Sequence, residues 1–521
     1  MLFNSYEFVF AYMPLTFVLL FALRARSSTA AVWFLLGASL FFYGWWSISH
    51  VPLLLGSVVF NYACGKSISR VAAVDRARAK RLLVLPIAGD LLLLGYFKYA
   101  NLALDALHHL PGVEMHRLDV VLPLGISFYT FTQIAFLVDA SEGKIDDPKF
   151  CSYGLFVTYF PHLIAGPILH HRPMMAQFQT WAAFRLNLGN VAAGFSYFCI
   201  GLGKKVLIAD SIAPYADAVF DAAKAGTLLT LLEAWGGVLA YSAQLYFDFS
   251  GYSDMAIGLG LMMGISLPLN FNSPYQASSI IEFWRRWHMT LSRFLRDYLY
   301  ISLGGNRRGV WRQYLNMMLT MLLGGLWHGA NWTFLAWGGL HGFFLAMNHG
   351  YRALTTSLGY DPLGLSRPSG RAVAWSLTML AVALGWVLFR ADSFSSAANI
   401  IRSMFGTNGI VLPHALRQYL GALDGVVTFG GAFGNGIVQD WTTAWTIILA
   451  ALAGAILLPN SQYLFRNASL WPDNELSAGN LPATRAVAWR PSIGWLAVIA
   501  AIFVCSLFRM TGVSTFLYYQ F

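Results

Sequence analysis

Apolar runs dominate the pattern along this chain, and polar residues collect in short segments between them. A helix that crosses a bilayer needs about 20 mostly apolar residues. Runs of this kind predict spanning helices at 8–23, 31–48, 82–97, 119–138, 191–209, 227–247, 315–348 (interrupted), 373–389, 441–458 and 492–508. Shorter or broken runs lie at 51–63, 153–169 and 254–269, which gives roughly 10–13 membrane segments. The pattern therefore predicts an all-α, polytopic integral membrane protein.

The composition agrees with this class. The 521 residues are 57% hydrophobic and only 11% charged, whereas a soluble globular chain carries about 25% charged residues. The formal net charge of +10 is typical of cytoplasmic loops in a membrane protein. We therefore expect the lipid bilayer as a partner and no nucleic acid. The four cysteines show no CxxC spacing, which predicts neither a zinc site nor a disulfide framework.

Lysine and arginine indicate the orientation. The loop 65–81 holds six of them and is expected in the cytoplasm, with Arg24 and Arg26 on the same side and the amino terminus outside. We expect one membrane domain over residues 1–521. Within it we predict a core at 1–350 with a motif region at 241–348. Residues 351–521 should add C-terminal membrane helices and a polar loop at about 460–490.

Residues 241–348 differ from ordinary spans. The stretch "YSAQLYFDFSGYSDMAIGLG" places Tyr252 and Asp254 in a polar patch between apolar runs, and "LNFNSPYQASS" follows it. Irregular backbone cannot face lipid, so this stretch should be buried in protein, line a cavity or lie at the membrane interface. We therefore treat Tyr252 and Asp254 as candidate substrate-binding residues.

The segment "IIEFWRRWHMTLSRFLRDYLY" (280–300) predicts an amphipathic helix that is too charged to span the membrane. Arg285, His288 and Ser292 recur on one face, and Arg293 and Asp297 are spaced four apart so that they can pair. One interpretation is a basic interfacial helix lying on anionic lipid. The other is a re-entrant helix that contributes to a site.

His328 is the most informative single residue. It lies in the glycine-broken apolar run "MLLGGLWHGANWTFLAWGGL" (321–340), beside Trp327 and three residues before Asn331. An imidazole at membrane depth is costly unless its nitrogens have partners, and ionisable groups there often mark function. A lone histidine in an apolar helix is usually a satisfied core residue. The charged region just before His328 favours the functional interpretation, with Asn331 fixing the ring or lining the same cavity.

Several long motifs resemble one known family. "GGLWHGANW", preceded by "FWRRWHMTLSRFLRDYLY", is similar to the membrane-bound O-acyltransferase (MBOAT) family, and more narrowly to its bacterial alginate O-acetyltransferase branch. The segments "LPLGISFYTFTQIAFLVD", "YFPHLIAGPI", "YFDFSGYSDMAIGLGLMMG" and "YLYISLGGNRRG" match the same branch. The resemblance covers most of residues 1–350 and is weak beyond them.

The resemblance implies a fold and a set of roles. The fold is a ring of helices around a central tunnel, with re-entrant or interfacial helices. The catalytic histidine of the family corresponds to His328, and its second functional position corresponds to His288. His288 would orient a substrate, polarise a carbonyl or relay a proton. His162, in "YFPHLIAGPI", matches the branch pattern and is a further candidate site residue.

The residues also suit acyl transfer chemically. A hydroxyl becomes a good nucleophile when a base takes its proton, and a histidine with an ordinary pKa of about 6.5 suits that role. Asn331, Trp327 or backbone amides would stabilise the oxyanion. We expect no bound cofactor and no metal. The acyl donor enters as a co-substrate, and acetyl-CoA is the natural candidate, although no nucleotide-binding motif supports it.

The hypothesis is an inner-membrane O-acetyltransferase. It would pass an acetyl group from a cytoplasmic donor across the membrane for O-acetylation of an exported polysaccharide, alginate-like or another exopolysaccharide. The expected partners are a periplasmic or extracytoplasmic acetyltransferase and the polysaccharide synthesis and export machinery. One alternative is D-alanyl or other acyl transfer to a cell-wall polymer. The other is a polytopic transporter, for which Asp90 in an apolar run is the main clue.

Overall fold

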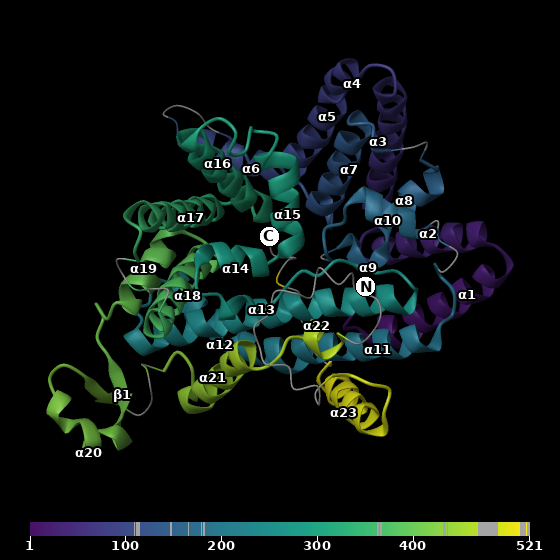
Figure 1. Cartoon of the computed structure of the whole chain (residues 1–521). Coiled ribbons are helices and arrows are strands. Elements are labelled where there is room, and N and C mark those ends of the chain that lie inside the picture. Colours follow the sequence, from purple (N-terminus) through teal and green to yellow (C-terminus); the bar gives the residue numbers. More distant parts are fainter. Residues whose placement is uncertain are drawn as a thin grey trace.

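The chain folds into a predominantly helical structure, seen in the computed structural model of Figure 1. The structure describes all residues except 109, 111–114, 146–147, 165, 179, 181–182, 362–363, 365–366, 431–433, 435, 467–487, 511–516 and 518–521. Most of the expected polar loop at 460–490 therefore lies outside the described residues.

The elements follow one another in chain order. The first group is η1 (Glu7–Tyr12), α1 (Met13–Arg26), α2 (Ser28–Gly44), η2 (Ile48–His50), α3 (Val51–Ala72), α4 (Arg76–Leu82), α5 (Val84–Leu94), η3 (Gly95–Tyr99), α6 (Ala100–His108), α7 (Ile126–Ser141), α8 (Phe150–Thr158) and α9 (Phe160–Leu163). The second is α10 (His171–Phe178), α11 (Leu188–Gly203), η4 (Lys204–Ala209), α12 (Asp210–Lys224), α13 (Leu231–Met262), η5 (Pro274–Gln276), α14 (Ile280–Arg286), α15 (Met289–Phe294) and η6 (Leu295–Tyr300). The third is α16 (Val310–His328), α17 (Trp332–Leu358), α18 (Pro368–Arg390), α19 (Phe394–Met404), β1 (Val411–Pro413), η7 (His414–Leu416), α20 (Arg417–Leu420), η8 (Gly421–Leu423), β2 (Thr428–Gly430), α21 (Trp441–Leu457), α22 (Ser461–Leu464) and α23 (Ile493–Arg509).

The described helices include segments of membrane-spanning length. Five are long and apolar enough to cross a bilayer: Glu7–Arg26, Ile48–Ala72, Arg76–His108, Leu188–Lys224 and Pro368–Arg390. Three shorter apolar helices are Ser28–Gly44, Trp441–Leu457 and Ile493–Arg509. The prediction of an all-α, polytopic membrane protein is confirmed.

The polar patch around Asp248 and Asp254 does not interrupt its helix. The runs expected at 227–247 and 254–269 form one helix of 32 residues, α13, which begins at a capping box between Thr230 and Glu233. Lys205 pairs with Asp248 at 2.7 Å, and Lys204 pairs with Asp254 at 2.7 Å. Because both carboxylates are neutralised by η4, the helix continues through them.

The expected amphipathic helix at 280–300 is broken, which corrects that prediction. His288 adopts left-handed backbone geometry with φ of 41° and separates α14 from α15. The backbone groups at the break bind the preceding extended segment. Asn272 N–H donates to the Arg286 carbonyl at 2.9 Å, and Met289 N–H donates to the Asn270 carbonyl at 2.9 Å. The shared face predicted for Arg285 and His288 is therefore lost.

The interrupted run at 315–348 forms two packed helices, as expected. α16 ends at His328 and α17 begins at Trp332, with Asn331 as its N-cap accepting from Thr333 N–H at 3.2 Å. A Cβ at Gly325 would overlap the Phe334 carbonyl oxygen, and one at Gly338 would overlap the Met321 carbonyl oxygen. These two glycines let the helices approach closely enough to fix the end of α16.

Two ends of the molecule can be told apart. Ser69 Oγ donates to the Ile145 carbonyl at 2.7 Å, which holds the C-terminal end of α7 beside the basic loop 65–81. We call this side the basic end. Trp46 follows α2 and precedes α3, so it lies at the opposite end of α3. A small lobe with β1 and β2, paired in parallel from Val411 opposite Thr428, stands apart at the lower left of Figure 1.

Candidate active site

His328 lies in an aromatic environment at the last residue of α16. The residue is only 5% exposed. Its ring centroid is 4.9 Å from that of Trp327, 5.1 Å from Trp337 and 5.1 Å from Phe389. The ring of His288 is 6.4 Å away. The two histidines predicted as catalytic are therefore brought together from segments 40 residues apart.

His288 is held in one tautomer by Asn270. Its Nδ1 lies 2.9 Å from Asn270 Oδ1, and Thr290 donates to the same oxygen through its backbone N–H at 3.4 Å and its Oγ1 at 2.9 Å. A backbone N–H only donates, so this Asn270 atom is the acceptor oxygen. His288 Nδ1 must then carry the proton, which leaves Nε2 as the basic nitrogen.

Lys98 and Tyr99 hold the end of the helix that carries His328. Lys98 Nζ donates to the carbonyl of Trp327 at 2.5 Å, to that of His328 at 3.3 Å and to Ser127 Oγ at 3.2 Å. Tyr99 OH donates to the Leu326 carbonyl at 2.7 Å. The last carbonyls of a helix have no partner within it, so these contacts supply one.

A cavity of about 130 Å³, here called the histidine cavity, reaches His328 from the end opposite the basic loop. Its lining combines Lys98, Trp327 and His328 with Trp46, Ile164 and residues 122–128. An adjacent cavity of about 360 Å³ contains Lys98, Asn331, Phe389 and Asp392 among its lining residues. Asn331 therefore borders a cavity beside His328 while its Nδ2 donates to the Asp392 carbonyl at 3.0 Å.

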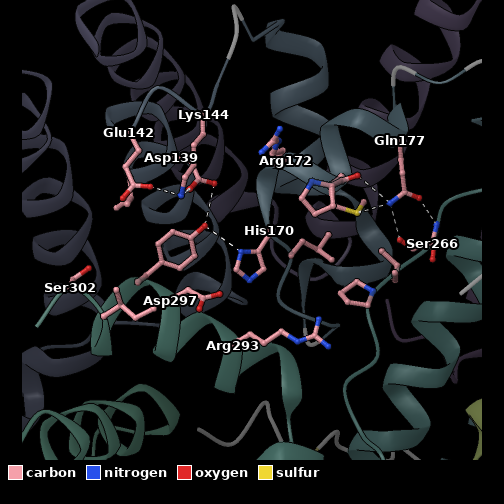
Figure 2. Close-up of a pocket in the computed structure, with 18 residues that line it drawn as sticks. Asp139, Glu142, Lys144, His170, Arg172, Gln177, Ser266, Arg293, Asp297 and Ser302 are labelled. Carbon is pink, nitrogen blue, oxygen red and sulfur yellow. Dashed lines mark hydrogen bonds and ion pairs between the residues drawn. The ribbon is translucent and has the colours of Figure 1, made fainter. Parts of the chain in front are cut away.

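A larger cavity of about 990 Å³, here called the basic-end cavity, opens at the other end of α7 and is drawn in Figure 2. Its basic lining residues are Arg172, Arg293 and Lys144, and its acidic lining residues are Asp139, Glu142 and Asp297.

His170 also lines the basic-end cavity, close to Tyr298. Tyr298 OH donates to Asp139 at 3.2 Å and lies 3.3 Å from His170 Nδ1 (Figure 2). Burial lowers the pKa of His170 below its ordinary value, so its ring is neutral at pH 7. The lining therefore holds three basic and three acidic side chains at that pH, and Lys144 forms ion pairs with Glu142 and Asp139.

An aromatic cluster separates the two cavities. Phe131 stacks on Phe294 with centroids 4.6 Å apart and on Trp327 at 5.7 Å. Phe128 joins them at the histidine cavity, and Tyr298 joins them at the basic-end cavity. The structure thus shows two separate cavities with packed rings between them, and the central tunnel that the resemblance implies stays a prediction.

The structure places the other predicted site residues in different surroundings. Asp254 binds Lys204 and Ser461, and Tyr252 stacks on Phe3 with centroids 4.6 Å apart. His162 is buried with its Nε2 2.8 Å from the Phe156 carbonyl. Arg285 is exposed, and Ser292 Oγ donates weakly to the Trp287 carbonyl at 3.5 Å.

Asp90 and Asp297, two charged residues noted in the sequence, both have partners inside the protein. Asp90 accepts a hydrogen bond from Asn61 at 2.8 Å, so it is a paired buried residue. Asp297 pairs with its neighbour Arg296 at 2.7 Å. In the part of the chain that the structure describes, no group of three His, Cys, Asp or Glu residues is arranged to hold a metal ion.

Sequence reasoning missed Lys98. The expected span at 82–97 ended one residue before Lys98. A lysine just after a span is typical of an anchor at the membrane interface, so it did not indicate a role in the site. Its partners Trp327 and His328 are 229 and 230 residues away. No local signal marks a contact of that separation.

The chain is similar in sequence to several known acyl-transferring proteins. The chain is 38% identical over 528 residues to the probable alginate O-acetylase AlgI of Pseudomonas putida, and the alignment covers 100% of both chains. It is 43% identical over 446 residues to the peptidoglycan O-acetyltransferase of Helicobacter pylori, covering 80% of this chain and 82% of that protein. A more distant relative, at 27% identity, is the teichoic acid D-alanyltransferase of Streptococcus thermophilus, covering 46% of this chain and 59% of the relative.

The family profile described as "MBOAT, membrane-bound O-acyltransferase family" matches residues 40–387. This span contains His288, His328, Lys98 and the aromatic cluster between the two cavities. The resemblance read from the motifs is confirmed, and the chain is an acyltransferase that belongs to the membrane-bound O-acyltransferase family.

Proposed function

We propose that this chain transfers an acetyl group from a cytoplasmic donor to the opposite face of the bacterial inner membrane, for O-acetylation of a polysaccharide. The observation that carries this proposal is the placement of His328. It is buried beside His288 and borders a cavity at the end opposite the basic loop. A base at that position can serve an acceptor from one side and a donor from the other.

The positive-inside rule supports the direction of transfer. It assigns the basic loop 65–81 to the cytoplasm, and with it the basic-end cavity. Arginine side chains suit a phosphate-bearing donor, and Arg172 and Arg293 supply them there. We therefore propose acetyl-CoA as the donor, with its phosphates at the basic-end cavity.

The transfer step uses His328 as general base. The acceptor hydroxyl oxygen attacks the acetyl carbonyl carbon while the imidazole takes the hydroxyl proton. The carbon–sulfur bond of the thioester then breaks, and the released thiolate takes up a proton. A positioned base of this kind contributes about 10²–10⁴-fold to the rate. We assign His288 to the proton path, because Asn270 holds its Nδ1–H and leaves Nε2 to accept.

The relatives guide the choice of acceptor. Two relatives that match most of this chain are named for alginate and for peptidoglycan, and both names describe O-acetylation of a polysaccharide. We propose such a polymer as the final acceptor of the acetyl group. A periplasmic acetyltransferase partner and the machinery that makes and exports the polymer bring the two together. D-alanyl transfer is less well supported, because the teichoic acid relative covers less than half of this chain.

The test is a strain that lacks this gene and carries His328→Ala at wild-type membrane level. We expect the ester content of the polymer to fall by at least about 10²-fold, because the general base is gone. His116→Ala is the matched control, since His116 is exposed and should leave the ester content unchanged. Wild-type ester content in the His328→Ala strain contradicts the proposal. Mass analysis of the polymer in the same strains identifies both the ester and the acceptor.

A further inference from the structure

Lys98 is a buried lysine that is held entirely by backbone and hydroxyl acceptors near His328. Its residue is 9% exposed, and its three acceptors are the carbonyls of Trp327 and His328 and the hydroxyl of Ser127. An ammonium group has three donors. All three find an acceptor inside the protein, which distinguishes Lys98 from a lysine that reaches for the membrane surface.

These contacts join the walls of the histidine cavity. Lys98 comes from η3, Ser127 from α7, and Trp327 and His328 from α16. All four residues line that cavity, and Lys98 also lines the adjacent one that holds Asn331. The ammonium is therefore the point at which three separate elements are fixed relative to the imidazole.

The end of α16 needs such a clamp. The residue after His328 is Gly329, whose extended backbone ends the helix without a capping N–H bond. Exposed carbonyls at membrane depth are costly, and a cation at a helix C-terminus is favourable. The π-helical turn at η3 has more residues per turn than an α-helix, so Lys98 and Tyr99 both reach neighbouring carbonyls of α16.

We propose that Lys98 is a positioning residue for acyl transfer, which fixes the last turn of α16 so that the His328 ring meets both donor and acceptor. This inference rests on the proposed role of His328. A small displacement of a base is costly, because a misplacement of about 1 Å lowers a rate by about 10²-fold.

The experiment compares variants at matched membrane level in the deletion strain, and it measures the initial rate of ester formation on the polymer. Lys98→Met keeps the length of the side chain and removes its donors, and we expect a loss of about 10²-fold. Lys98→Arg restores a cation with donors and should recover at least about tenfold over Lys98→Met. Lys80→Met, on the exposed surface of α4, should keep the wild-type rate.

Two further measurements separate positioning from folding. The melting temperature of purified Lys98→Met should stay within a few degrees of the wild type while its rate falls. Tyr99→Phe removes the neutral hydrogen bond to the Leu326 carbonyl, which precedes that of Trp327, and should lower the rate only about threefold. If Lys98→Met does not reach the membrane, Ser127→Ala is compared instead. It removes one of the three acceptors and should lower the rate about threefold at normal level.

The outcomes distinguish this inference from the proposed function. A wild-type rate in Lys98→Met, together with an inactive His328→Ala, overturns the role of Lys98 alone. A failure of Lys98→Arg to recover any rate, or a wild-type rate in Ser127→Ala where that variant is used, overturns it as well. A wild-type rate in His328→Ala overturns the proposed function itself.

Discussion

At the level of single residues, Asn270 and His288 form a buried pair in which one amide oxygen receives three donors. The donors are His288 Nδ1, Thr290 N–H and Thr290 Oγ1, while Asn270 Nδ2 donates to Ser253 Oγ at 3.3 Å. The amide is thus fixed in orientation by its neighbours. His288 cannot change tautomer without losing the bond to Asn270.

Replacing Asn270 should therefore impair catalysis through His288. We expect Asn270→Ala to lower the initial rate of ester formation about 10–100-fold, since removal of a buried acceptor costs about 1–3 kcal/mol. The rate is measured at matched membrane level. Asn399→Ala is the control, because Asn399 Nδ2 bonds the Thr227 carbonyl outside both cavities. Equal rates for the two variants would show that the tautomer of His288 has no part in transfer.

At the level of elements, the packing of α16 on α17 positions His328. Gly338→Ala should push the helices apart, because the new Cβ overlaps the Met321 carbonyl oxygen, which is backbone and cannot rotate away. We expect a loss of about 1–3 kcal/mol in stability, seen as a lower melting temperature, together with a lower rate. Gly350→Ala lies in the same helix with open space around its Cβ, so its melting temperature should not fall. An unchanged melting temperature in Gly338→Ala contradicts this packing.

The sequence predicted the elements well where hydropathy alone decides them. Apolar runs located most of the spanning helices, although the short run expected at 51–63 is part of a full-length span, Ile48–Ala72, and the run at 119–138 becomes helical only from Ile126. The glycine break before Asn331 located the division between α16 and α17. It did not predict that α13 continues through Asp248 and Asp254, because the lysines that neutralise them lie more than 40 residues earlier. It also missed the break at His288, whose backbone partners are on a separate extended segment.

The candidate site was also predicted only in part from the sequence. His328, His288 and Trp327 were identified from motifs, and the structure gathers them. Lys98 was not identified, because its contacts depend on the tertiary fold and not on a local pattern. Sequence shows which residue types are present at membrane depth, whereas only the fold shows which of them share a cavity.

At the level of the whole molecule, the two cavities lie at opposite ends of α7, with packed aromatic rings between them. The basic-end cavity is the larger and carries the arginines, and the histidine cavity is small and carries the proposed base. In the proposed reaction, a donor bound at the basic end has to pass its acyl group beyond Phe131 and Phe294 to meet His328.

The basic-end cavity should govern donor affinity. We expect the double variant Arg172→Gln and Arg293→Gln to raise the KM for acetyl-CoA about tenfold, with little change in kcat, because two charged contacts to phosphate are removed. The measurement uses purified protein with labelled acetyl-CoA. Lys80→Gln is the control, since it removes an exposed charge of α4 outside the cavity. A changed kcat with an unchanged KM would place the donor phosphates elsewhere.

The most direct test uses sealed membrane vesicles of known orientation, supplied with acetyl-CoA labelled in the acetyl group. With the basic end facing outward, wild-type vesicles should incorporate label into an ester that lies in the lumen and resists added esterase. His328→Ala vesicles should incorporate at least about 10²-fold less. Equal incorporation by the two proteins, or incorporation only when the basic end faces the lumen, would contradict transfer from the basic end past His328.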